Sequence, residues 1–435
     1  MKYNFTEGQL KLICINLSEE IKKGDKLLNN KDITIFNSSI LELKNSNNLL
    51  IASRGWYGNI RSWDGINFVI LSLFTKDLKK IKQNILDIDK NLLKNKELVF
   101  KDFKNKIIPH EKHILEGPED PRLFYYNDDL YILVNELTND KKRHMFVSKI
   151  DVNNLIYDVN KIDLCKSLST NFEKNWGSFI YKNKLHMLYD INPLKIFEVD
   201  DNFKCKMSCN INDSILKKFS ESYPELHFHI RNSTNLINLD SNKFLGMGHG
   251  VLDYKNNIDI NKYLIPTFNK SKYSSSDKEY FKRFFKLYTG FFFILDMNKK
   301  EITEISPFFQ LPNYESKQEL IFFPTSIYLD NEKYINISYN VGDNRSYFLR
   351  LHLDIIKLSL YDKKNIDFQV NHNINTNYYL ELTRNIRKLM GYSTLKKDYY
   401  KFKDVNRTLS STGSKKKKKS KKKSKKKKKS KKNLR

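Results

Sequence analysis

The sequence predicts an all-β fold, a five-bladed β-propeller with a few peripheral helices and a disordered, lysine-rich C-terminal tail. Three observations lead to this prediction. A strand–turn–strand pattern occurs five times, further strand-like runs separate the copies, and helical periodicity is confined to the edges and one insertion. Each repeat therefore has material for about four strands, and four-stranded sheets repeated radially are propeller blades. A β-sandwich whose hairpins resemble one another by coincidence is the alternative.

The five hairpins share an alternating apolar strand, a short polar turn and a second alternating strand, which is a standard hairpin pattern. They begin at Ile40, Arg122, Ser178, Thr234 and Thr325. The runs FVILSLF, HMFVSKI, KIFEVD, GFFFILD and FLRLHLDII supply further strands.

The predicted organisation has four parts. They are an N-terminal extension over 1–30, the propeller over 31–370, a helical or irregular segment over 371–413, and the tail over 414–435. Amphipathic spacing predicts three peripheral helices, SEEIKKGDKLL near residue 20, DKEYFKRFFKLY near 283 and LELTRNIRKLM near 385. Neither a signal peptide nor a transmembrane segment is recognisable, because the N-terminal run LKLICINL is short and contains a lysine.

The tail dominates the charge of the chain. It contributes +16 of the formal net charge of +28 and contains no acidic residue, so the preceding residues carry only +12. Such a segment cannot fold alone, since it has almost nothing apolar to bury. It suits binding to nucleic acid, attraction to an anionic membrane surface, nuclear import, or a purely solubilising role.

Four cysteines, Cys14, Cys165, Cys205 and Cys209, are too few for a disulfide framework in a chain of 435 residues. Cys205 and Cys209 lack a matching Cys/His pair, so no metal site is expected. The sequence predicts buried or indifferent thiols in a reducing compartment and hence an intracellular protein, which is cytoplasmic, or nuclear or nucleic-acid-associated through the tail.

The stretch EGPEDPRLF at residues 116–124 precedes the second hairpin. Gly117 and Asp120 each precede a proline, so the stretch is extended and cannot begin a helix. Neighbouring side chains on an extended chain point to opposite sides, which predicts that only one of Glu119 and Asp120 faces a site. Hairpin ends opposite the turns should converge on one face. There Asp120, Asn175, Ser233 and Phe323 each lie seven residues before the first turn residue.

That face collects Arg, Asp, Asn, His and Trp, a mixture that suits a sugar. Its motifs resemble glycoside hydrolase family 130. They are EDPR, the pattern SxDGxxF with Ser62, Asp64, Gly65 and Phe68, the pairs His249–Gly250 and Phe323–Pro324, Tyr288 ahead of Leu295–Asp296, and Tyr339-x-x-x-Asp343. The resemblance runs in order from Leu50 to Leu351. It implies a five-bladed propeller that phosphorolyses or hydrolyses β-mannosides, or a related β-1,2-mannosyltransferase.

By that resemblance Asp120 is the general acid of an inverting single displacement, whose proton can pass through a sugar hydroxyl. A general acid must be protonated at working pH, so we expect its pKa to be raised. Glu119 and Arg122 would support it from behind; the structural alternative pairs Arg122 with Glu119.

The candidate substrate-binding residues are Arg54, Arg61, Asp64, Lys174, Asn175, Asp190, Arg231, His249 and Asp343. The cations and His249 would accept inorganic phosphate or the phosphate of a sugar-phosphate or nucleotide-sugar donor, and Asp343 would contact sugar hydroxyls. Structural salt bridges are the alternative for each cation. Trp56 and Trp63 suit either sugar stacking or packing.

One departure from the family bears on the reaction. Phosphorolytic members usually place an arginine after the third hairpin, where this chain has Asp190. A carboxylate there argues against simple phosphorolysis and leaves hydrolysis or transfer from a bulkier donor. No cofactor beyond such a phosphate or donor is expected, and no metal. Two other functions stay open: a non-catalytic sugar-binding propeller, and an interaction protein anchored to nucleic acid by its tail.

Overall fold

The computed structural model describes residues 13–59, 64–88, 117–138, 142–158, 160–166, 173–214, 216–217, 227–253, 286–306, 321–331, 333–357 and 359–363. All of these lie in the first of two compact units, Met1–Gly391. The second unit, Tyr392–Arg435, lies outside the described residues, as do the predicted tail and the predicted helix near 385.

The described chain is almost entirely β, which confirms the predicted fold class. Its strands form four sheets. Besides helical residues at 214, 216 and 217, the described ranges contain two short helices, α1 (Leu17–Lys22) and α6 (Leu353–Lys357). Neither helix is long and apolar enough to span a membrane.

The first sheet contains β20 (Phe322–Asp330), β21 (Tyr334–Val341), β22 (Arg345–His352), β2 (Ile33–Glu42), β3 (Asn48–Asn59), β4 (Asp64–Thr75) and β5 (Lys80–Leu86), with β1 (Ile13–Asn16) paired to β22. The second contains β10 (Ile162–Asp163), β8 (Arg143–Asp151), β7 (Asp129–Leu137) and β6 (Glu119–Tyr126), with β9 (Ile156–Tyr157) on β8. The third contains β11 (Gly177–Tyr181), β12 (Lys184–Ile191), β13 (Leu194–Val199) and β14 (Cys205–Ile211). The fourth contains β15 (His227–Asn232), β17 (Lys243–Asp253), β18 (Lys286–Asp296), β19 (Glu301–Ile305) and β23 (Tyr361–Asp362), with β16 (Ile237–Asn238) on β17.

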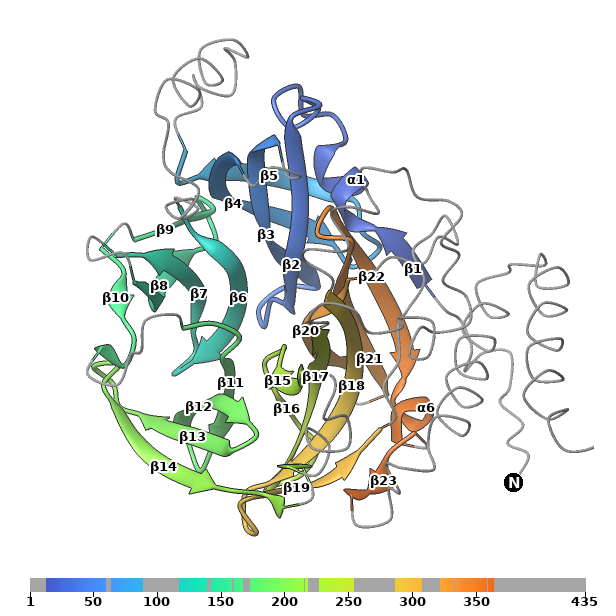
Figure 1. Cartoon of the computed structure of the whole chain (residues 1–435). Coiled ribbons are helices and arrows are strands. Elements are labelled where there is room, and N and C mark those ends of the chain that lie inside the picture. The colour runs from blue at the N-terminus through green and yellow to red at the C-terminus, as the bar shows by residue number, and fades with distance from the viewer. Residues whose placement is uncertain are drawn as a thin grey trace, which may run out of the picture. The chain divides into compact units, whose positions relative to one another are not determined.

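The eight-stranded first sheet is two groups of strands joined at one point. Its β2 and β22 are parallel and share a single residue pair, Ile35 with Arg345, whereas the other pairings are antiparallel. Dividing the sheet there leaves five groups, each built on one of the predicted hairpins. Figure 1 shows the groups arranged about a common centre, with β2, β6 and β20 on the inside and β5, β14 and β23 on the outside.

The hydrophobic core is divided among neighbouring groups. Five clusters of buried side chains each draw on two adjacent groups, and one of them joins the last group to the first through Tyr328, Phe348, Ile51 and Phe68. A β-sandwich has one core between two sheets, so this closed series favours the propeller. The count of five blades stays a prediction that the arrangement supports.

The predicted hairpins form because their turns have suitable residues. The two-residue turns Asn127–Asp128 and Lys182–Asn183 have positive φ at both positions, between 47° and 61°. These values belong to type I′ turns, which match the twist of the flanking strands. In the fourth hairpin the first arm is split into β15 and β16.

The N-terminal residues are part of the packed unit. Strand β1 pairs with β22, and Leu17 and Ile21 of α1 are fully buried. The Ser18 hydroxyl donates to the Ile35 carbonyl at 2.6 Å and accepts from the Ser346 amide at 2.8 Å. The helix near residue 20 is thus confirmed as an amphipathic helix, with one face in the core and Glu19 exposed on the other.

The helix predicted near residue 283 falls mostly outside the described residues. Its last three residues, 286–288, belong to β18 and pair with β17, so helical periodicity was misleading there. The strand that contains GFFFILD begins at Lys286, which is earlier than the sequence pattern indicated.

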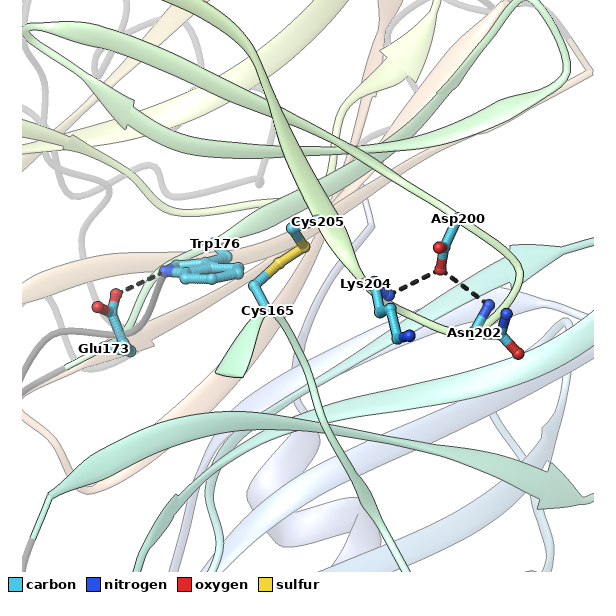
Figure 2. Close-up of a disulfide and its surroundings, with 7 residues drawn as sticks. All are labelled: Cys165, Glu173, Trp176, Asp200, Asn202, Lys204 and Cys205. Carbon is cyan, nitrogen blue, oxygen red and sulfur yellow. Dashed lines mark hydrogen bonds between the residues drawn. A yellow bond between two sulfur atoms is a disulfide. The ribbon is translucent and has the colours of Figure 1, made fainter. Parts of the chain in front are cut away.

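A disulfide joins Cys165 to Cys205, which overturns the expectation of free thiols (Figure 2). Cys165 follows β10 and Cys205 begins β14, so the bond links the second and third sheets. The residues are 40 positions apart with their Cα atoms 4.9 Å from each other, a separation normal for disulfides. The sequence could not reveal this pair, because only packing of the two sheets brings it together. Cys209 is buried and free.

Candidate functional site

The EDPR segment is positioned by a glycine. Gly117 has φ +84°, and a Cβ atom at this position would collide with the Asn67 carbonyl oxygen of β4. Glycine therefore allows the chain to lie directly against β4 before it enters β6. As predicted, no helix begins here, and β6 starts at Glu119.

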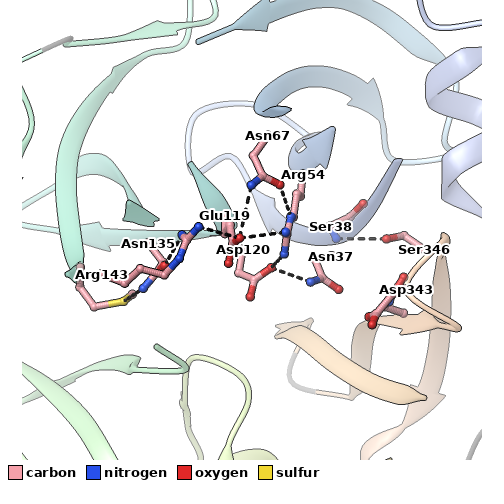
Figure 3. A network of polar contacts seen from close by, with 12 residues as sticks. Asn37, Ser38, Arg54, Asn67, Glu119, Asp120, Asn135, Arg143, Asp343 and Ser346 are labelled. Atoms are coloured by element: carbon pink, nitrogen blue, oxygen red, sulfur yellow. Dashed lines mark hydrogen bonds and ion pairs between the residues drawn. The ribbon is translucent and has the colours of Figure 1, made fainter. Parts of the chain in front are cut away.

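Glu119 and Asp120 do not point to opposite sides, and the prediction that they would is wrong. Asp120 has φ +50°, and a β-bulge lies between Glu119 and Arg122, so the alternation of an extended strand is broken. Both carboxylates contact one guanidinium (Figure 3). Arg54 Nη2 lies 3.0 Å from Glu119 Oε1, and Arg54 Nη1 donates to Asp120 Oδ1 at 3.1 Å.

Arg54 is held firmly in place. It comes from β3, is 5% exposed, and donates from Nε to Asn67 Oδ1 at 2.7 Å. Its guanidinium lies over the Phe36 ring, 4.8 Å from the centroid. Because two carboxylates share this buried cation, Arg54 organises the centre of the site.

Glu119 is bound by a second arginine that sequence reasoning missed. Arg143 Nη2, at the start of β8, lies 3.0 Å from Glu119 Oε1, and Asn67 Nδ2 donates to the same oxygen at 3.3 Å. Arg143 Nη1 also donates to Asn135 Oδ1 at 2.8 Å. Little in the local sequence of Arg143 signals this contact, since it depends on how β6, β7 and β8 pair.

Asn37 is a second residue that sequence reasoning missed. Its Nδ2 donates to Asp120 Oδ1 at 2.6 Å, and its φ of +49° places it in a bulge of β2. A signal was present: Asn37 lies seven residues before Lys44, where the first hairpin turns, which is the same offset as Asp120 and Asn175. Asn175 also has positive φ, +65°.

The pKa of Asp120 is lowered, whereas a resting general acid was expected to have a raised one. Burial acts to raise the pKa of this carboxyl, but Arg54, the Asn37 hydrogen bond and Arg122 outweigh burial. Asp120 is therefore ionised in the ligand-free protein.

The pKa of Asp343 is shifted in the opposite direction to that of Asp120. It lies between β21 and β22 with φ +49° (Figure 3), and its Oδ1 accepts from Asn340 Nδ2 at 3.2 Å. Burial raises the pKa of Asp343 to about 6; Arg54 and Lys174 oppose this rise, and Asp120 and Glu119 reinforce it. The fields of Arg54 and Asp120 reach Asp343, which places the three groups in one region.

His249 lies in an electropositive part of the site. It is 2% exposed, its Nδ1 lies 2.6 Å from the Ser233 hydroxyl, and its ring stacks on Tyr288 and packs against Phe323. Burial lowers the pKa of His249 well below its usual value. The neighbouring charges lower it further, in the order Arg231, Lys174, His229 and Arg122. A neutral imidazole among cations suits an anionic ligand.

Two cations connect these groups electrostatically. Lys174 acts on both Asp343 and His249, and Arg122 acts on both Asp120 and His249. Lys174 and Arg231 are exposed, and Arg231 pairs with His249 across β15 and β17. The structure thus brings Asp120, Asp343 and His249 to the same end of the sheets.

Other predicted residues have structural contacts. Arg122 is buried and donates from Nη1 to the Thr325 carbonyl at 2.8 Å, an inter-sheet contact in place of the pairing with Glu119 expected as the structural alternative. The buried Asn175 accepts from Asn232 Nδ2 through its backbone carbonyl at 3.2 Å. Trp56 is fully buried, which favours packing over sugar stacking.

Asp190 caps a turn. Its Oδ1 accepts from the backbone amides of Ile191 at 2.8 Å and Asn192 at 3.3 Å, directly before Pro193. Burial raises the pKa of Asp190, while these amides, Arg231 and Lys195 act to lower it. Arg61 and Trp63 lie outside the described residues, and Asp64 begins β4 with a side chain that is not described. Within the described ranges, no three His, Cys, Asp or Glu residues gather as metal ligands.

Comparison with known proteins gives likeness only at the level of structure. No family model and no curated protein sequence matches the chain. A mannose phosphorylase from Leishmania mexicana, solved with phosphate, is 12% identical with a TM-score of 0.43, over 74% of this chain and 84% of that one. A β-1,2-mannobiose phosphorylase from Listeria innocua is 11% identical with a TM-score of 0.43, over 76% and 94%. A GDP-Man-dependent mannosyltransferase from Leishmania mexicana is 11% identical with a TM-score of 0.40, over 74% and 85%.

Proposed function

We propose that the protein is a carbohydrate-active enzyme that transfers or cleaves a glycosyl unit, with a β-mannosyl group as the preferred unit. Asp120 passes the reacting proton in an inverting single displacement. One observation carries the proposal: Asp120 is fixed through Oδ1 by Arg54 and Asn37 from two other strands. Its Oδ2 accepts no hydrogen bond from a described residue, so this oxygen is available to exchange a proton with a substrate.

The surroundings of Asp120 suit both parts of a glycosyl donor. Asp343 and Asp120 supply oxygens for sugar hydroxyls, and Lys174 and Arg231 supply charge for a phosphate. The phosphate can be inorganic, part of a sugar phosphate, or part of a nucleotide sugar. The preference for mannose rests on the motif resemblance of residues 50–351.

The experiment compares wild type, Asp120→Asn and Asp128→Asn with mannose 1-phosphate, GDP-mannose and β-mannobiose in separate reactions. Asp128 is a surface carboxylate at the opposite, turn end of the same hairpin, 94% exposed at its side chain, so its variant is the matched control. We expect product from at least one substrate with wild type and Asp128→Asn, and none with folded Asp120→Asn. Binding of mannobiose in calorimetry without any product would instead support a sugar-binding propeller.

The tail supports a separate proposal, that residues 414–435 bind a polyanion such as nucleic acid. This rests on sixteen basic residues without an acid in that segment. Phosphate contacts of this kind release counterions, so binding must weaken steeply with salt. The proposal is independent of the chemistry at Asp120.

A further inference from the structure

The site contains three carboxyl groups that differ in the donors they receive. Glu119 receives two arginines and the Asn67 amide. Asp120 receives one arginine and the Asn37 amide, both on Oδ1. Asp343 receives only the neutral amide of Asn340 and forms no ion pair with a described residue.

This difference in donors favours protonation of Asp343 over protonation of Asp120. Hydrogen bonds and cations directed at a carboxylate favour its ionised form, and desolvation favours the neutral form. Arginine side chains contact the carboxylates of Glu119 and Asp120 directly. Asp343 forms no ion pair with a described residue, and cations influence it only through longer-range electrostatics. The charged groups acting on Asp343 are Arg54 from β3, Lys174 ahead of β11, and Asp120 and Glu119 from β6. The two cations oppose the effect of burial and the two anions reinforce it, and burial is the largest influence on the protonation of Asp343.

The Asn340 contact is compatible with a neutral Asp343. Asn340 is fully buried, and its Oδ1 has no hydrogen-bond partner among the described residues. If the amide turns over, Oδ1 replaces Nδ2 at 3.2 Å from Asp343 Oδ1 and accepts the carboxyl proton. One contact can therefore serve both protonation states, as a group that exchanges a proton requires.

We propose that Asp343 is the proton source of the reaction and that Asp120 is the relay through which the proton reaches the leaving group. The proposal rests on the proposed function and assigns a further catalytic residue to it. In the resting state below about pH 6, Asp343 is neutral and Asp120 is paired with Arg54 as an anion.

The proton transfer proceeds in two steps. First the O–H bond of Asp343 breaks, a sugar hydroxyl lying between the two carboxyls passes a proton on, and an O–H bond forms at Asp120 Oδ2. Asp120 then gives this proton to the leaving oxygen as the bond from that oxygen to C1 breaks, with the electron pair going to the oxygen. A phosphate oxygen forms the new bond to C1, or a water oxygen does so while one of its O–H bonds breaks and the proton passes to solvent. Solvent returns a proton to Asp343 after product leaves.

The resting protonation state can be tested without any substrate. Infrared difference spectra of the full-length protein, titrated from pH 4 to 8, detect the C=O band of a neutral carboxyl. Because burial also raises the pKa values of Asp190 and Glu136, the band of interest is the component that wild type has and Asp343→Asn lacks. We expect this component to disappear around pH 6 in wild type and in Asp128→Asn. In Asp120→Asn the band should persist but disappear at lower pH, because the anion that favours neutral Asp343 is gone. This shift keeps the test decisive if Asp343→Asn does not fold. A band lost in Asp120→Asn, or a wild-type midpoint near 4, overturns the assignment.

The kinetic arm uses the substrate that wild type turns over. We expect Asp343→Asn to lower kcat/KM at least about 100-fold and to remove the fall in rate above pH 6, as loss of a proton donor does. Asp128→Asn should keep the wild-type rate and pH profile. Normal turnover by Asp343→Asn with an unchanged profile overturns the proton-source role and leaves the proposed function intact. A wild type without turnover on any substrate overturns both, even where the infrared band is present.

Discussion

Asp343 makes the stability of the protein depend on pH in a way that one substitution can remove. Its folded pKa of about 6 lies above the ordinary value of 3.8 that it has in the unfolded chain. Below pH 3.8 the carboxyl is neutral in both states and contributes nothing. As the pH rises, the unfolded state ionises first, so wild type loses stability until the folded group has also ionised.

The magnitude follows from the size of the shift. A rise of about two units corresponds to about 3 kcal/mol lost above pH 7, with most of the change between about pH 4 and 6. Asp343→Asn stays neutral and does not pay this penalty. Its free energy of unfolding relative to wild type should therefore improve by about 1.4 kcal/mol between pH 5 and pH 8, the part of the change that lies above pH 5.

Urea denaturation of wild type, Asp343→Asn and Asp128→Asn at pH 5 and pH 8 measures this difference. A constant loss of packing in Asp343→Asn cancels in the comparison, because it is the same at both pH values. The Asp128→Asn control removes a carboxyl of the same type from the surface. Its free energy of unfolding should differ from that of wild type by nearly the same amount at pH 5 and at pH 8. If the free energy of unfolding of Asp343→Asn relative to wild type stays constant or declines from pH 5 to pH 8, the reasoning is refuted.

Three other perturbations have expected outcomes. Arg54→Met leaves Glu119 and Asp120 without their shared buried cation and should lower the free energy of unfolding by about 3–5 kcal/mol in urea titrations, with Arg54→Lys less damaging. Reduction of the Cys165–Cys205 bond, which spans 40 positions, should cost up to about 4 kcal/mol, whereas a double Ser variant should not respond to reductant. Deleting residues 414–435 should abolish salt-sensitive binding of a DNA duplex while glycosyl turnover continues; retained binding would place the polyanion site elsewhere.

The fold could be predicted from the sequence because its determinants are local. Alternating apolar residues and turn pairs such as Asn127–Asp128 specify a hairpin within about twenty residues, and all five predicted hairpins form. Relations between sheets could not be read in this way. The Cys165–Cys205 bond and the contact of Arg143 with Glu119 join segments whose proximity depends on packing. The same holds for α1, whose buried face is defined by strands far along the chain.

The candidate site was predicted in part. Arg54, Asp120, His249 and Asp343 are brought together, but the relation between Glu119 and Asp120 was wrong. The error came from assuming regular strand geometry at a position where Asp120 has positive φ. A bulge of this kind reverses the direction of a side chain, and no alternation rule anticipates it.

Bulges hold Asn37 in β2 and Asp120 in β6, and Asn175, directly ahead of β11, shares their offset and conformation without a bulge in the β11–β12 pairing. Each lies seven residues before a turn, and each has φ between 49° and 65°. Asn and Asp tolerate this left-handed region better than other residues with a side chain, so the inner strands can turn a polar group out of register at little cost. The fold thus determines where the polar side chain at this offset lies, and the choice between Asn and Asp determines whether that side chain is charged. The same reasoning makes Asp120→Asn a test of chemistry, because asparagine accepts a φ of +50° as readily as aspartate does while removing the carboxylate that pairs with Arg54.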